Sequence, residues 1–82
     1  MIELLANSLV DYAKSINKSV QLQYTGICFI IRSNQTRQGI VYLYKDGTIS
    51  YYFKNWPDYY PNITISWPNC INILKECIQY YA

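Results

Sequence analysis

The reactive side chains of this chain are few and are not spaced for catalysis. Its 82 residues include three cysteines, five acidic residues and no histidine. Histidine is the commonest general base and metal ligand, and a cysteine with no base beside it forms little thiolate at neutral pH. Cys70 and Cys77 are seven residues apart, a spacing that suits packing along a helix better than a zinc site. We therefore expect a protein that is not an enzyme, with no catalytic residue, no metal and no cofactor.

Recognition of a partner is the chemistry that the composition favours. Ten of the residues are tyrosine, which supplies large contact area and a polar hydroxyl at interfaces and on base-stacking platforms. Trp56, Tyr59 and Tyr60 lie in a segment that also holds two prolines, so it is not helical. Such a loop is poorly suited to bury three large aromatic side chains. We expect a recognition loop there, with Asp58 as a contact residue.

Basic side chains mark a second candidate contact region. Arg32, Arg37 and Lys54 are expected near one end of the sheet beside Tyr52, where their groups suit contacts with phosphate and bases. The seven basic residues are scattered, however, and the formal net charge is only +2. Because nucleic-acid binders usually carry clustered Lys and Arg, solvated strand ends are the stronger interpretation. The predicted partner-binding residues are Trp56, Asp58, Tyr59, Tyr60, Tyr52, Arg32, Arg37 and Lys54.

Two amphipathic helices are predicted at the two ends of the sequence. Residues 2–17 repeat apolar side chains at spacings of three and four, which is typical of a helix with one buried face. The polar segment 17–19 is expected to end this helix. Toward the C-terminus, Ser66 is a candidate N-cap and Pro68 fits a first helical turn. The apolar stripe predicted for the second helix consists of Ile71, Leu74, Cys77, Ile78 and Tyr81.

The chain between the helices predicts an antiparallel meander. Its three segments are 27–33, 39–45 and 48–54. Asp46-Gly47 is a strong signal for a two-residue hairpin turn, and 34–37 would form a four-residue loop before it. These two turns pair Arg32 with Gly39. They also place on one face the pairs Tyr44 with Ile49, Tyr42 with Tyr51, Ile40 with Phe53, Ile31 with Ile40, Phe29 with Tyr42 and Ile27 with Tyr44.

The predicted fold is one small α+β domain over residues 1–82, with an antiparallel sheet of three or four strands between the two helices. Segment 20–25 is either a first strand or an extended lead-in, and 62–66 alternates as a short edge strand does. In the predicted register the opposite sheet face also carries apolar side chains, namely Cys28, Ile30, Val41, Leu43 and Tyr52. Either both helices cover one face and a partner covers the other, or one helix covers each face.

The expected function is binding of another protein by a non-catalytic module. A small inhibitor or adaptor that acts by steric occlusion would fit, of the kind that mobile elements encode against host nucleic-acid-processing machinery. The same surface would also allow a homodimer. Single-stranded nucleic-acid binding by tyrosine stacking is the alternative. The odd number of cysteines suits reduced thiols in the cytoplasm, and no apolar run approaches the ~20 residues that span a membrane.

Overall fold

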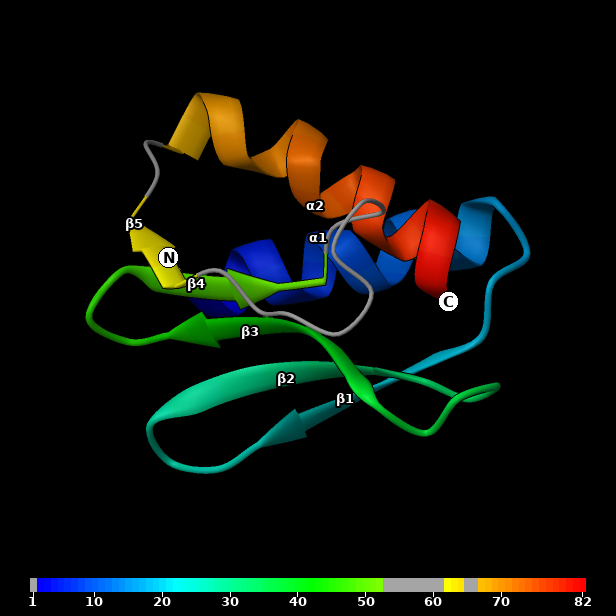
Figure 1. The fold of residues 1–82 in the computed structure, drawn as a ribbon, viewed down its shortest axis with the longest axis horizontal. Coiled ribbons are helices and arrows are strands. Elements are labelled where there is room, and N and C mark those ends of the chain that lie inside the picture. The colour runs from blue at the N-terminus through cyan, green and yellow to red at the C-terminus, as the bar shows by residue number, and fades with distance from the viewer. Residues whose placement is uncertain (1, 53–61, 65–66) are drawn as a thin grey trace.

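The chain folds into one antiparallel sheet with a helix before it and a helix after it (Figure 1). The computed structural model describes residues 2–52, 62–64 and 67–82. The elements are α1 (Ile2–Ser15), β1 (Val20–Tyr24), β2 (Cys28–Ser33), β3 (Gly39–Tyr44), β4 (Thr48–Tyr51), β5 (Asn62–Thr64) and α2 (Trp67–Tyr81). The predicted α+β class is confirmed. Both segments that flank the predicted meander form strands, so the sheet has five strands in the order β1-β2-β3-β4-β5.

Helix α1 ends in a Schellman motif centred on Asn17. The Lys18 N–H donates to the Ala13 carbonyl at 2.8 Å, and the Asn17 N–H donates to the Lys14 carbonyl at 3.1 Å. Asn17 has a φ of 61°, a left-handed conformation that asparagine tolerates better than most residues. The predicted stop at 17–19 is confirmed, and the chain turns there toward β1.

Both helices cover the same face of the sheet (Figure 1). Helix α1 contacts β1, β2 and β3, while α2 contacts β3 and packs against α1. The large side chains of this layer that have no solvent exposure are Leu9, Ile31, Val41, Leu43, Leu74 and Ile78. Of the two arrangements left open by the sequence, the structure has both helices on one face. Neither described helix has the length and apolar character of a membrane-spanning segment.

The hairpin between β3 and β4 closes with three loop residues and not with the predicted two. The Gly47 N–H donates to the Tyr44 carbonyl at 3.0 Å, and Gly47 has a φ of 92°. A type I turn followed by a left-handed glycine is the usual three-residue hairpin. The Asp46 carboxylate supports it by accepting the Thr48 N–H at 2.8 Å, which also lowers the pKa of Asp46. The register is therefore shifted by one residue. The predicted pairs Tyr44 with Ile49 and Tyr42 with Tyr51 are wrong, and the observed pairs are Leu43 with Ile49, Tyr42 with Ser50 and Val41 with Tyr51.

The hairpin between β2 and β3 contains a β-bulge. Arg32 pairs with Gly39, as predicted for a four-residue loop. Ile40 is the extra residue of the bulge, because Ile31 pairs with Val41. The predicted pairs Ile31 with Ile40, Phe29 with Tyr42 and Ile27 with Tyr44 are wrong, and the observed pairs beyond the bulge are Ile31 with Val41, Ile30 with Tyr42, Phe29 with Leu43 and Cys28 with Tyr44. The predicted partner of Ile40, Phe53, lies outside the described residues.

Each register shift is one residue, so together they displace β4 relative to β2 by two residues. This displacement preserves the facing of both strands and leaves only β3 facing the other way. Val41 and Leu43 are fully buried under the helices. Tyr42 and Tyr44 lie half-buried on the opposite face. The bulge also lets Ile40, at 1% exposure, join the same core as Val41.

Gly39 is enclosed by side chains of the face opposite the helices. A Cβ atom on Gly39 would lie 2.5 Å from Tyr42 Oη and 2.8 Å from Ile30 Cγ2. Gly39 does not have a positive φ, so the requirement for glycine is one of space. The Tyr42 side chain therefore lies against the backbone at the start of β3.

We predict that Gly39→Ala lowers the free energy of unfolding by about 1–3 kcal/mol, because the added methyl group overpacks this site. Urea unfolding monitored by circular dichroism measures the change. The cost should be smaller in a Tyr42→Ala background, which removes the nearest atoms. An equal cost in both backgrounds would contradict the role assigned to the tyrosine ring.

Helix α2 carries two of the three cysteines of the chain, Cys70 and Cys77, and both lie in the core with exposures of 1% and 2%. The predicted stripe is confirmed, since Leu74 and Ile78 are fully buried beside Cys77; its candidate cap Ser66 lies outside the described residues. Burial raises the pKa of Cys77 to about 12, with a smaller contribution from the Glu76 carboxylate. Burial also raises the pKa of Cys70. These thiols are therefore protonated packing groups at neutral pH.

We predict that stability falls as pH rises above about 9. The Cys77 thiol releases its proton near its ordinary pKa of 9.0 in the unfolded chain but only near 12 in the folded chain. The folded state binds more protons between these values, so the free energy of unfolding decreases with pH, by at most about 1.4 kcal/mol per pH unit for this group.

Urea unfolding in reducing buffer from pH 8 to 10.5 measures this slope. The variant Cys77→Ala should show a shallower slope over the same range, and the remaining slope should come from Cys70 and Tyr51, whose pKa values burial also raises. An unchanged slope in the variant would show that another group causes it.

Candidate binding surface

The structure describes three of the eight predicted partner-binding residues. These are Arg32, Arg37 and Tyr52. The other five, Lys54, Trp56, Asp58, Tyr59 and Tyr60, lie outside the described residues, so the predicted recognition loop remains a prediction.

Arg32 and Arg37 come together, as the sequence predicts. Both line a hollow of about 410 Å³, with Gln21, Ser33 and Asn34. The loop after β2 brings them together: the Arg37 N–H donates to the Ser33 carbonyl at 2.8 Å, and Arg37 has a φ of 59°. The described lining of this hollow contains two guanidinium groups and no carboxylate. Its chemistry suits an anion.

Tyr52 does not join the two arginines. Its ring centroid lies 5.6 Å from that of Tyr81 in α2, and the half-buried side chain packs against the core. Tyr52 is not among the described residues that line the hollow with the two arginines. Tyr52 contributes to the junction of sheet and helix.

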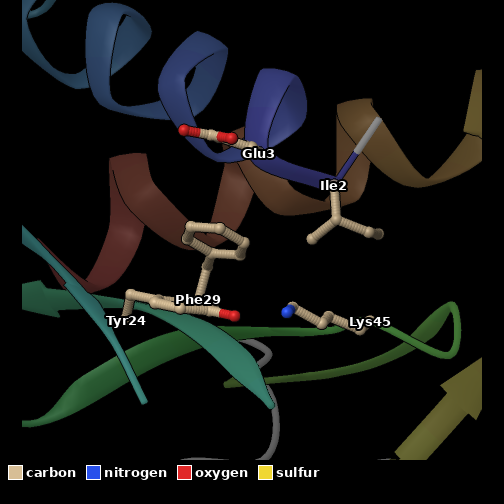
Figure 2. A pocket seen from close by; sticks show the side chains of 5 residues that line it. All are labelled: Ile2, Glu3, Tyr24, Phe29 and Lys45. Carbon is tan, nitrogen blue, oxygen red and sulfur yellow. The ribbon is translucent and has the colours of Figure 1, made fainter. Parts of the chain in front are cut away.

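A second surface, which the sequence did not reveal, lies where the β1–β2 and β3–β4 turns meet the start of α1. Ile2, Glu3, Tyr24, Phe29 and Lys45 line a hollow of about 640 Å³ there. Figure 2 shows Ile2 and Glu3 on the first turn of α1, opposite the two aromatic rings, with the Lys45 amine directed toward Tyr24. The Tyr24 and Phe29 ring centroids are 4.6 Å apart, and Lys45 Nζ lies 5.0 Å from the Tyr24 centroid.

A smaller hollow of about 320 Å³ adjoins the first at Lys45. Its lining includes Gly26, Ile27, Tyr44 and Asp46. Ile27 is 69% exposed and Tyr24 is 50% exposed. We call the combined lining of the two hollows, residues 2, 3, 24, 26, 27, 29, 44, 45 and 46, the hairpin-end surface.

Backbone hydrogen bonds hold the hairpin-end surface in place. The Thr25 N–H donates to the Cys28 carbonyl at 3.0 Å, and Gly26 takes a φ of 97° to close the β1–β2 turn. The Lys45 N–H then donates to the Ile27 carbonyl at 3.1 Å, which ties the two turns together. The exposed Ile27 side chain and the Lys45 ammonium group therefore project from a fixed backbone.

The hairpin-end surface combines apolar and charged side chains. Aromatic and aliphatic side chains line it, and its charged groups are the Lys45 ammonium and the Glu3 and Asp46 carboxylates. Such a surface can receive an apolar side chain and pair with a charged neighbour. Among the described residues, no group of His, Cys, Asp and Glu side chains is arranged to hold a metal ion.

Sequence reasoning missed this surface because of the register. Ile27 was expected within a strand, paired with Tyr44 on the face that carries the other aligned apolar residues. In the structure it lies in the β1–β2 turn, before β2 begins at Cys28. The available signal was Gly26, since a glycine directly before an apolar run can also mark a turn.

Comparisons with protein-family models, curated proteins and solved structures find no match to this chain.

Proposed function

We propose that this chain is a non-catalytic protein-binding module and that the hairpin-end surface is its contact site. One observation supports this most strongly. Of the five exposed large apolar side chains in the described part of the chain, two, Tyr24 and Ile27, belong to this surface. An exposed apolar cluster with polar residues at its edge is typical of a protein interaction site.

The lining of the surface specifies the partner's chemistry. A hollow with Tyr24 and Phe29 in its wall accepts an apolar or aromatic side chain. Lys45, at the junction of the two hollows, favours an acidic group next to that side chain. The proposed partner is therefore a cytoplasmic protein that presents an apolar side chain beside a carboxylate. The module acts as an inhibitor or adaptor by occupying that site on its partner.

Single-stranded nucleic acid is the second candidate ligand. The hollow that contains Arg32 and Arg37 favours it, because its described lining offers two cations to a phosphate. Tyr42 and Tyr44 lie half-buried on the sheet face that the helices leave uncovered. The formal charge of +2 supplies little of the electrostatic attraction on which such binding depends.

We predict that Ile27→Asp weakens binding of the protein partner by at least about tenfold, because it places a charge in the contact site and opposite the proposed carboxylate. The partner is first captured from native lysate after nuclease treatment, and its affinity for each variant is then measured by calorimetry. Thermal stability should change little, since Ile27 is 69% exposed.

Tyr80→Asp is the matched control, because Tyr80 is also strongly exposed, at 61%, but lies on α2. This variant should bind as the parent does. Equal affinity of the parent and Ile27→Asp would reject the hairpin-end surface as the contact site. Capture of nucleic acid alone, with affinity that falls steeply with salt and with Arg37→Gln, would favour the second candidate.

A further inference from the structure

Among the described residues, strand β1 is an open edge of the sheet with none of the usual protection. It pairs with β2 on one side only, over five consecutive residues without a register shift. Its sequence Val-Gln-Leu-Gln-Tyr contains no charge and no proline, and four of its five residues are exposed. Natural edge strands usually carry lysine, proline or a bulge, because an unprotected edge pairs readily with another strand.

The backbone groups that face this open edge can be identified. The Ser19 carbonyl accepts the Asn34 N–H at 3.1 Å, and the Thr25 N–H donates to the Cys28 carbonyl at 3.0 Å, so the backbone groups of odd-numbered residues point toward β2. The backbone N–H and C=O groups of successive residues in a strand point alternately to its two sides. The N–H and C=O groups of Val20, Leu22 and Tyr24 therefore point toward the open edge.

The side chains of these three residues share the face that the helices cover. Leu22 pairs with Ile31 and Tyr24 pairs with Phe29, and the β2 partners belong to or pack on the core. At the edge, however, Leu22 is 37% exposed and Tyr24 is 50% exposed. Gln21 and Gln23 point to the other face, where Gln23 Oε1 accepts the Arg32 Nε–H at 2.7 Å. Each outward-facing backbone position thus carries an apolar side chain.

We propose that two copies of this chain join through β1, antiparallel, about a two-fold axis at Leu22. In this register Leu22 pairs with Leu22 of the second copy, and Val20 pairs with Tyr24 of the second copy. All three outward-facing positions then form hydrogen-bonded pairs, each of which exchanges two backbone hydrogen bonds. Apolar side chains oppose apolar side chains on one face, and Gln21 opposes Gln23 on the other.

The self-complementarity of β1 identifies the occupant as a second copy. The strand alternates apolar and amide side chains symmetrically about its middle residue, so rotation by 180° places each side chain opposite one of its own kind. No charge on either copy meets a like charge along the strand. The joined sheets continue without a break, and the helices of both copies lie on the same face.

The arrangement would place two hairpin-end surfaces on one assembly. Tyr24 is at the hairpin end of β1, so the two surfaces flank the joint at its opposite ends. A dimer of this kind could bind a partner with repeated sites at two points. The inference itself rests on the geometry of β1 and does not require the proposed function.

Disulfide cross-linking tests the register. A hydrogen-bonded pair has Cα atoms about 5.5 Å apart, within the range of a disulfide. Leu22→Cys should therefore give a covalent dimer on mild oxidation. Val20→Cys alone should not, because the two copies of residue 20 would be about 14 Å apart. The double variant Val20→Cys, Tyr24→Cys should cross-link again, since position 20 of each copy lies opposite position 24 of the other.

The parent chain is the control for background cross-linking, because Cys28, Cys70 and Cys77 are all buried. Cross-linking of Val20→Cys as efficient as that of Leu22→Cys would overturn the proposed register. Absence of cross-linking in both Leu22→Cys and the double variant would overturn pairing through β1.

The oligomeric state tests the dimer without new cysteines. Light scattering after size exclusion should give twice the 9.7 kDa mass of one chain for the parent. Leu22→Lys should raise the dimer dissociation constant by at least about tenfold, because it places like charges opposite each other on the axis. Leu4→Lys is the matched control, since Leu4 is 69% exposed but lies on α1.

A parent chain that stays monomeric up to millimolar concentration would overturn the proposal, and so would a dimer that Leu22→Lys leaves intact. Ile27→Asp should leave the dimer unchanged, so a failure of partner binding and a failure of dimerisation can be distinguished. A monomer whose partner binding is lost in Leu22→Lys would assign the edge to a foreign strand and reject self-pairing.

Discussion

Strand β3 has apolar side chains on both faces, and only one of them can lie under the helices. One face carries Val41 and Leu43, and the other carries Tyr42 and Tyr44. The aliphatic pair is fully buried, while the tyrosines are half-buried on the opposite face. Burying an aliphatic side chain removes no polar group from water, whereas a buried tyrosine hydroxyl needs a hydrogen-bond partner. The facing of β3 determines which of its side chains the two helices pack against and which lie on the opposite face of the sheet.

Two local backbone features decide on which face of the sheet each β3 side chain lies. The bulge at Ile40 moves the β2–β3 register by one residue, and the three-residue turn ending at Gly47 moves the β3–β4 register by one more. A strand alternates strictly, so one residue of shift turns every side chain of β3 to the other face. The two shifts together displace β4 by two residues relative to β2, which is one full period of a strand, so β2 and β4 keep a common buried face. The core is continuous across the four longer strands for this reason.

The same turns build the hairpin-end surface. The three-residue turn places Lys45 where its backbone N–H reaches the Ile27 carbonyl and its side chain reaches the ring of Tyr24. Ile27 is left in the neighbouring turn with most of its side chain exposed. At the other end of the sheet, the loop after β2 gathers Arg32 and Arg37. Apolar and cationic contact regions are therefore held at opposite ends of the central strands. The buried thiols of α2, which remain protonated at neutral pH, contribute packing and no reactivity to either region.

The sequence by itself determined the element types and their order. Helical periodicity and the polar stop after residue 16 predict α1, the stripe around Leu74 predicts α2, and alternation predicts the strands, because each of these signals is local. It also placed the two arginines together, since a four-residue loop fixes their spacing. The facing of β3, the choice of one sheet face for both helices and the exposure of Ile27 were decided by the tertiary structure. Asp-Gly fits both a two-residue and a three-residue hairpin, and a bulge leaves no clear local signal. The facing of β3 depends on the whole sheet, because the favoured register is the one that buries more apolar surface when the sheet packs against the helices.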